Sequence, residues 1–117
     1  MKPNPLVELS GQFAVDIVNI CTAIKNRRKA NVLLNQLLRR GTSIGANIHE
    51  ANYASSKADF VAKMQIALKE CHETEYWLKL FAKTNIISGE EYSKLSNDSG
   101  KIRRILISSI NTAKANA

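Results

Sequence analysis

Apolar residues recur at three- and four-residue steps through most of the chain, which predicts four long amphipathic helices. Asn4 and Pro5 suit a helix start, because a capping side chain precedes a proline in the first turn. Polar breaks in the pattern place the expected helices at residues 5–28, 31–53, 56–84 and 89–114. Short connections between them predict an all-α fold, an up-down-up-down antiparallel four-helix bundle forming one domain over residues 1–117. The first stripe consists of Leu6, Leu9, Phe13, Ile17, Ile20 and Ile24.

The second and third expected helices show the clearest pattern, with a polar turn at residues 53–56 between two unbroken apolar stripes. Gly41 and Gly45 lie on or beside the stripe of the second helix. A glycine within a helix costs about 1 kcal/mol relative to alanine, so we expect another helix backbone to come very close there. Ser56 and Asp59 predict a capping box. The stripes consist of Leu33, Leu34, Leu37, Leu38, Ile44 and Ile48, and of Phe60, Met64, Ala67, Cys71, Thr74, Leu78 and Phe81.

The fourth expected helix begins with a second capping-box pattern, in which Glu91 follows Ser88 by three residues. Residues 96–100 are serine, asparagine, aspartate and glycine, which favour non-helical conformations. We therefore expect a weak or bent place there. The apolar positions of this helix are Tyr92, Leu95, Ile102, Ile105, Leu106 and Ile110.

With 117 residues, 44% of them hydrophobic, the chain can form one core and is too short for two ordinary domains. No apolar run approaches the roughly 20 residues that a membrane helix requires, and the first residues do not resemble a signal segment. We expect a cytoplasmic protein without a membrane partner. In that reducing compartment Cys21 and Cys71, both on apolar faces, are expected to be buried free thiols.

The formal charge of +7 and the isoelectric point near 9.7 favour anionic partners, above all nucleic acid. Such a charge also merely keeps a small protein soluble. The cations that end the first helix have two interpretations: they suit the negative end of the helix dipole, or they contact phosphates. The candidate phosphate-binding residues are Arg27, Arg28, Lys29, Arg39, Lys101, Arg103 and Arg104.

The sequence lacks the metal and catalytic patterns of helical bundles. A di-iron site needs Glu-x-x-His motifs from two helices, but Ala46 stands three residues before His49 and Lys69 three before His72. Tyr76 occupies the position where a zinc-protease pattern from His72 needs a second histidine. There is no glycine-rich phosphate loop and no nucleophile elbow. We expect no enzyme, no metal site and no cofactor.

Residues 36–51, 56–60 and 67–78 resemble the signature of the bacterial four-helix-bundle proteins, also called 23S ribosomal RNA intervening-sequence proteins. The resemblance spans essentially the whole chain in one register. It implies a cytoplasmic four-helix bundle, commonly a ring-shaped homo-pentamer, without a settled biochemical role. A similar fold serves as the accessory protein of diversity-generating retroelements, which binds nucleic acid and a reverse transcriptase. Gly100 and Lys101 depart from the pattern, because helix-forming and acidic residues are expected there.

A polar row borders the apolar face of the second expected helix, and acids lie on the third. Arg40 can pair with one of these acids and Asn47 can bond between helices, which would fix the register of the bundle. The same row can instead line a binding groove. The row consists of Arg40, Ser43, Asn47 and Glu50, with Glu70 and Glu73 on the third helix.

A second apolar strip on the third expected helix consists of Ala62, Ile66, Trp77 and Leu80, and it lies well round from the core stripe. It predicts a subunit interface, unless neighbouring helices wrap far enough to bury Trp77 in the monomer. We thus expect a non-catalytic homo-oligomer, with a pentamer favoured, that binds nucleic acid, preferably RNA, without sequence specificity. The alternative is a protein-interaction module, such as an accessory subunit of a reverse transcriptase or another nucleic-acid enzyme.

Overall fold

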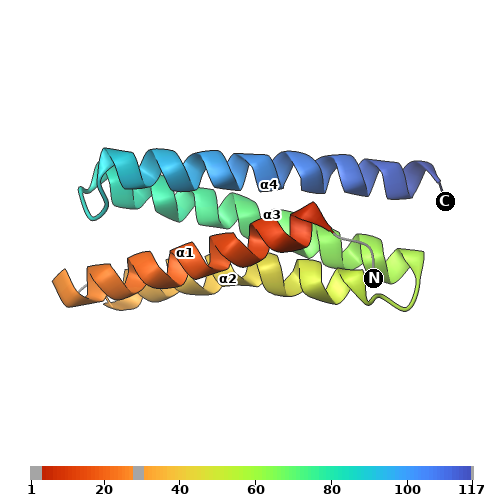
Figure 1. Cartoon of the computed structure of the whole chain (residues 1–117), viewed down its shortest axis with the longest axis horizontal. Coiled ribbons are helices and arrows are strands. Elements are labelled where there is room, and N and C mark those ends of the chain that lie inside the picture. The colour runs from red at the N-terminus through yellow and green to blue at the C-terminus, as the bar shows by residue number, and fades with distance from the viewer. Residues whose placement is uncertain (1–3, 28–30, 117) are drawn as a thin grey trace.

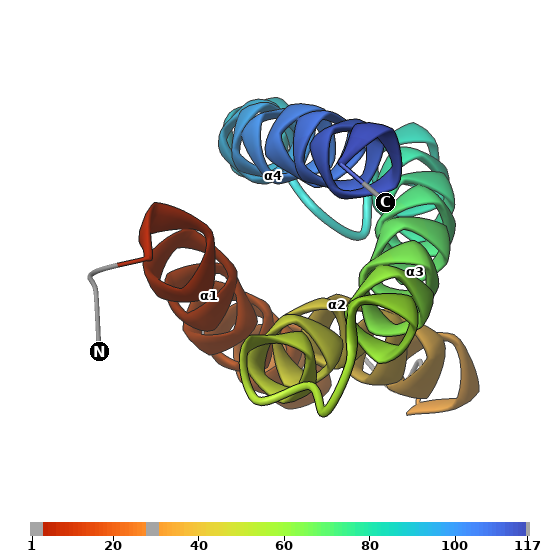
Figure 2. The same cartoon turned by 90° about the vertical axis from the view of Figure 1, so that its right-hand side faces the viewer.

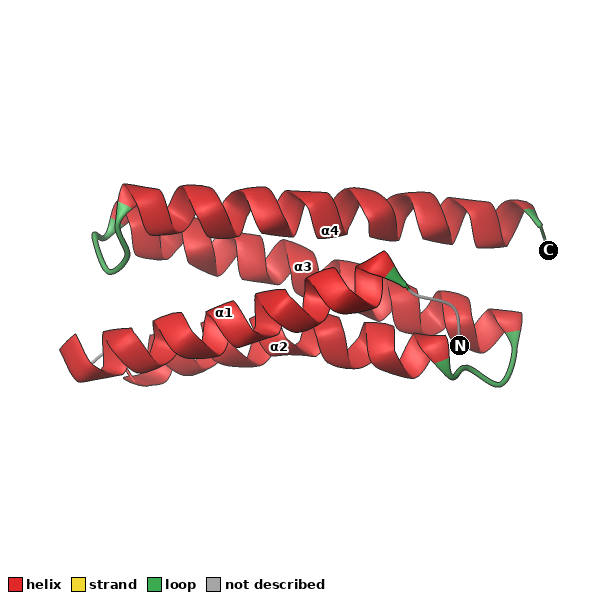
Figure 3. Ribbon diagram, in the orientation of Figure 1, coloured by secondary structure: helices red, strands yellow, loops and turns green. Residues whose placement is uncertain are grey.

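The computed structural model describes residues 4–27 and 31–116, and within these ranges it contains four helices and no strand. They are α1 (Pro5–Arg27), α2 (Asn31–Asn52), α3 (Lys57–Lys83) and α4 (Gly89–Ala115). The helices alternate in direction along a body of 47 × 23 × 19 Å (Figures 1 and 3). The predicted up-down-up-down bundle is confirmed, and every helix end lies within one residue of its expected position.

Each helix packs against the next one in the chain, and α4 returns beside α1, where the contact is least extensive (Figure 2). Among the described residues, no Cα atom of α1 lies within 8 Å of one in α3, and the same holds for α2 and α4, so the diagonal helices meet only through their side chains. The predicted stripes form the core, with two exceptions, since Leu9 is 38% exposed and Leu33 is 39% exposed. Leu9 lies seven residues before Asp16, on the side of α1 that faces α4, so the loose α1–α4 contact leaves it open. Leu33 lies in the first turn of α2, at the end of the bundle.

The expected weak place at residues 96–100 is wrong, because α4 continues through it without interruption. Ser99 and Gly100 are both buried. The Ser99 hydroxyl oxygen lies 3.4 Å from the Cys71 Sγ of α3. Packing against α3 therefore outweighs the low helix propensity of this segment.

The two expected capping boxes differ. At α4 the box is complete, since the Ser88 N–H donates to Glu91 Oε1 (2.8 Å) and the Glu91 N–H donates to Ser88 Oγ (3.0 Å). At α3 the Asp59 N–H donates to Ser56 Oγ (3.0 Å), but the Asp59 carboxylate accepts from the Ser55 N–H instead of from Ser56. Only half of the predicted box at Ser56 is therefore present.

Helix α1 is more apolar than the sequence pattern suggested. By length and composition alone, its residues Pro5–Lys25 could cross a membrane, which corrects the expectation that no segment approaches that length. A single such helix is weak evidence for a membrane protein, because a core helix of a bundle passes the same test. Only 33% of this segment is buried in the monomer, so α1 carries apolar residues on its outer side as well.

Candidate functional site

The ends of the predicted polar row join α2 to α3. Arg40 Nη1 donates to both carboxylate oxygens of Glu70 at 3.3 Å, and Arg40 Nε lies 3.0 Å from Glu73 Oε2. Lys63 Nζ of α3 lies 3.8 Å from Glu50 Oε2 of α2. Glu70 is only 8% exposed, so its carboxylate depends on the arginine for compensation. The predicted pairing of Arg40 with acids of the third helix is confirmed.

Ser43 and Asn47, in the middle of the polar row, form hydrogen bonds within α2. The Asn47 side-chain amide donates to the Ser43 carbonyl oxygen (2.9 Å), and the Ser43 hydroxyl donates to the Arg39 carbonyl oxygen (2.6 Å). The expected bond from Asn47 to another helix is therefore wrong. These two residues satisfy their polar groups one turn back along their own helix.

A line of polar side chains runs from the core to the surface between α3 and α4. Cys71 Sγ lies 3.4 Å from Ser99 Oγ and 3.5 Å from Glu75 Oε1, and Arg103 Nε donates to the same Glu75 oxygen at 2.9 Å. Burial raises the pKa of the Cys71 thiol to about 11, and it does the same for Cys21. Both cysteines are buried free thiols, as expected, and both stay protonated at neutral pH.

The pairing of charges leaves an excess of uncompensated cations. Within residues 4–27 and 31–116, only four cations hold six acids, and two further acids are used to cap helices. Most cations of the described residues therefore have no acid beside them. The ion pairs join Arg40 to Glu70 and Glu73, Lys94 to Asp16 and Asp98, Lys63 to Glu50, and Arg103 to Glu75, while Asp59 and Glu91 are the capping acids.

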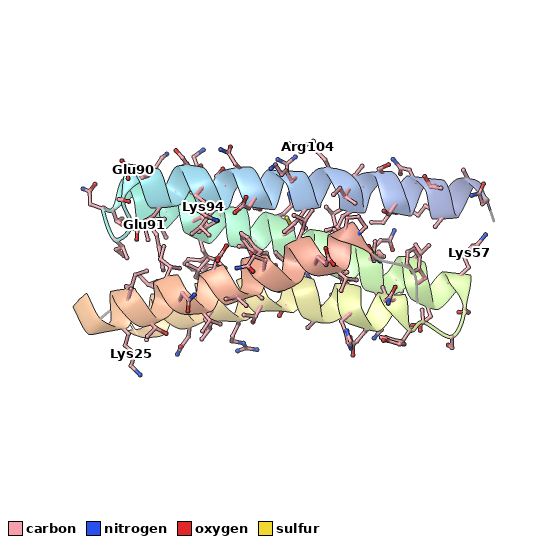
Figure 4. The ribbon with its side chains drawn as sticks, viewed as in Figure 1. Lys25, Lys57, Glu90, Glu91, Lys94 and Arg104 are labelled. Atoms are coloured by element: carbon pink, nitrogen blue, oxygen red, sulfur yellow. The ribbon has the colours of Figure 1, made fainter. Side chains whose placement is uncertain are left out.

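The structure does not bring the predicted phosphate-binding residues into one patch. Arg39 is exposed on α2, whereas Lys101 and Arg104 are exposed on α4, and α2 and α4 are not neighbouring helices in the bundle. Arg104 projects outward from α4 in Figure 4. Arg103 is half-buried and paired with Glu75. Of the remaining candidates, Arg28 and Lys29 lie outside the described residues, and so does the side chain of Arg27.

The C-terminal half of α4 is a basic segment of the described chain that contains no acid. After Asp98, helix α4 contains Lys101, Arg103, Arg104 and Lys114 and no acid. The outer surface around Lys101 and Arg104 has no ion pair within the part of the chain that the structure describes. This surface, which we call the α4 basic face, is a candidate for contact with an anionic polymer.

The predicted interface strip on α3 is only partly exposed. Ala62 is exposed, and Ile66 is 44% exposed. Leu80 is half-buried, and Trp77 packs against the hydrophobic core. Neighbouring helices therefore cover part of the indole, and the open portion of the strip lies around Ile66.

A family model described as "23S rRNA-intervening sequence protein" matches residues 4–108. The chain belongs to this family. A solved structure from Bacteroides thetaiotaomicron VPI-5482, described as a protein of unknown function from the S23 ribosomal protein family, is 50% identical with a TM-score of 0.88. The match covers 90% of this chain and 97% of that chain. No curated protein matches this chain significantly. The resemblance seen in the sequence motifs is thus confirmed.

The sequence analysis did not predict two features of the structure, the exposed valines of α1 and the polar line that begins at Cys71. Val15 and Val18 are 51% and 45% exposed on the outer side of α1. The signal was available, because both lie opposite the core stripe, where a helix facing water normally carries polar residues. The polar line that begins at Cys71 had a weaker signal, the four-residue spacing of Cys71 and Glu75, since its α4 partners depend on the register between helices.

Proposed function

We propose that this protein is a non-catalytic, cytoplasmic, homo-oligomeric bundle that binds nucleic acid through the α4 basic face without sequence specificity. The observation that carries the proposal is the uncompensated charge of Lys101 and Arg104 on a helix half that contains no acid. Such cations bind phosphates and release the counterions condensed on the polymer. The family description refers to an intervening sequence of 23S rRNA, so RNA is the first polymer to test.

Self-association would strengthen this binding. The exposed Val15 and Val18 of α1, together with Ile66 of α3, give the monomer apolar surface that a second copy can cover. An oligomer would present several α4 basic faces to one RNA, and weak phosphate contacts would then add through effective concentration. Light scattering at micromolar concentration tests this part, and a monomeric wild type would contradict it.

The RNA-binding test is a salt titration followed by fluorescence anisotropy of labelled single-stranded RNA. Lys101→Gln with Arg104→Gln removes two cations from the α4 basic face, and each phosphate contact contributes about 0.7 to the slope of log affinity against log salt. We expect the double variant to lower that slope by about 1.4. Lys25→Gln with Lys69→Gln is the matched control, because it removes the same charge from exposed residues outside this face.

Two results would contradict the proposal. Absence of binding at low salt would exclude a nucleic-acid function driven by charge. Equal losses in the two double variants would show that net charge, rather than the α4 basic face, determines affinity.

A second candidate function is a protein-interaction module, such as an accessory subunit of a reverse transcriptase or another nucleic-acid enzyme. The exposed apolar side chains of α1 favour it, because they suit any protein partner as well as a second copy. A wild type that is monomeric and does not bind RNA would leave this candidate in place of the first.

A further inference from the structure

Gly100 differs from Gly41 and Gly45, the two glycines at the contact between α1 and α2. A Cβ at Gly41 or Gly45 would meet atoms of α1, namely Ile17 or the Ser10 carbonyl oxygen. A Cβ at Gly100 would meet only the ends of two side chains of its own helix, Arg104 Nη1 at 3.3 Å and Arg103 Nη2 at 3.6 Å. The space that a side chain at residue 100 would fill is therefore occupied by two guanidinium groups.

Helix geometry explains how the two groups reach this place. Residues three and four positions apart are neighbours on a helix surface, and long side chains lean toward the helix N-terminus. Arg103 and Arg104 follow Gly100 by three and four residues, so both fold back over the glycine backbone. A Cβ at position 100 would require the Arg104 guanidinium group to shift by a few tenths of an ångström.

Of the two guanidinium groups, only that of Arg103 is paired with an acid among the described residues. Arg103 Nε donates to Glu75 at 2.9 Å, which fixes its orientation and leaves its Nη2 directed at Gly100. Arg104 is exposed and has no acid partner among the described residues. Two like charges that converge on one point repel each other, and Glu75 compensates only one of them. The unbalanced positive charge at this point favours an anion beside the pair.

We infer that Gly100, Arg103 and Arg104 form a phosphate-binding notch, in which the two guanidinium groups share the oxygens of one phosphate group. Guanidinium forks bind phosphate through paired, charge-assisted hydrogen bonds, which an ammonium group cannot reproduce. The identification of RNA as the ligand of the notch rests on the proposed function. In that case the notch binds one backbone phosphate of the RNA at a defined place on the α4 basic face. Its geometry also predicts binding of a free phosphate compound.

The experiment has two arms, a titration of the full chain with inorganic pyrophosphate and the RNA anisotropy measurement. In the first arm, NMR follows the arginine side-chain N–H signals, and we expect those of Arg103 and Arg104 to shift while that of Arg39 does not. Arg104→Lys keeps the positive charge but removes the planar guanidinium group with its paired N–H donors. It should therefore weaken pyrophosphate binding about tenfold. Arg39→Lys is the matched control on α2 and should leave the affinity unchanged.

Gly100→Ala separates the notch from a general effect on folding. Alanine raises helix propensity, and its Cβ displaces only the flexible ends of arginines, so the melting temperature should not fall. Phosphate affinity should nevertheless fall about threefold, because the added Cβ shifts the Arg104 guanidinium group away from its place beside Arg103. Circular dichroism confirms that each variant folds.

The possible outcomes distinguish the notch from the proposed function. If RNA binds but Arg104→Lys and Arg39→Lys have equal effects in both arms, the notch is wrong and the α4 basic face remains. If pyrophosphate shifts the two arginine signals and RNA does not bind, the notch stands and the nucleic-acid function is wrong. Pyrophosphate shifts that are spread over all arginines would also overturn the notch.

Discussion

The α1–α2 contact and the α3–α4 contact hold their helices together by different means. Between α1 and α2, glycines remove side chains, so that a Cβ at Gly45 would lie 3.2 Å from the Ser10 carbonyl oxygen and one at Gly41 would lie 2.9 Å from Ile17. Between α3 and α4, polar groups interlock, from the buried Cys71 through Glu75 to the surface.

This difference predicts two kinds of sensitivity. Backbones in close contact tolerate no added atoms, because neither helix can move without disturbing the core. Hydrogen-bonded side chains tolerate a change of size better but lose stability when a partner disappears. The first contact therefore responds to volume, and the second responds to the loss of hydrogen-bonding or charged groups.

The largest effect is expected from Gly45→Leu in the α1–α2 contact. The added side chain meets a backbone oxygen of α1, which cannot rotate away, so the free energy of unfolding should fall by about 3 kcal/mol. Gly11→Leu is the matched control, because a Cβ at Gly11 has nothing within 4 Å. Urea denaturation measures both variants. A Gly45→Leu midpoint equal to that of the wild type would show that the helices do not meet closely there.

A smaller loss of unfolding free energy is expected when the pH rises. Each of the two contacts contains one buried thiol, whose titration causes this loss. Cys21 Sγ lies 4.0 Å from the Leu34 carbonyl oxygen of α2, and Cys71 lies against α4. Burial raises the pKa of both thiols from 9.0 to about 11, so the folded state keeps a proton that the unfolded state releases. The stability from this difference is fully present below pH 9 and is lost as the pH rises toward 11.

At pH 10 each thiol should account for a loss of about 1.4 kcal/mol. The measurement is the change in unfolding free energy between pH 8 and pH 10 for the wild type, Cys21→Ala and Cys71→Ala. Each variant should lose less stability over this interval than the wild type does. Identical changes in all three proteins would mean that the thiols are not shielded from water.

The sequence predicted the close approach at Gly41 and Gly45 without identifying α1 as the other helix, and it predicted less of the α3–α4 contact, for a physical reason. Apolar periodicity and the glycine pair are local properties of one helix, and they suffice to place Gly41 and Gly45 at a close approach. Ser99 and Gly100 have low helix propensity, so the local pattern predicted a weak place, but burial against α3 keeps the helix intact. Which side chain meets which across two helices depends on their register. For that reason the sequence predicted that Arg40 pairs with an acid of the third helix but did not predict that Asn47 bonds within its own helix.

The smallest effect is expected where α1 meets α4, a contact that has neither glycines nor a buried polar line. Lys94 Nζ lies 3.2 Å from Asp16 of α1 and 3.0 Å from Asp98 of its own helix, and hydrogen bonds to Asp98 and then Asp16 raise the pKa of the lysine. The Lys94 side chain is 66% exposed, so water screens both pairs. Lys94→Met should therefore change the free energy of unfolding by less than about 1 kcal/mol. Asp16→Asn is the companion variant, and urea denaturation at low and high salt measures both. A larger loss in either variant would show that this pair carries the α1–α4 contact, and the bundle would then have a third mode of attachment that depends on exposed charge.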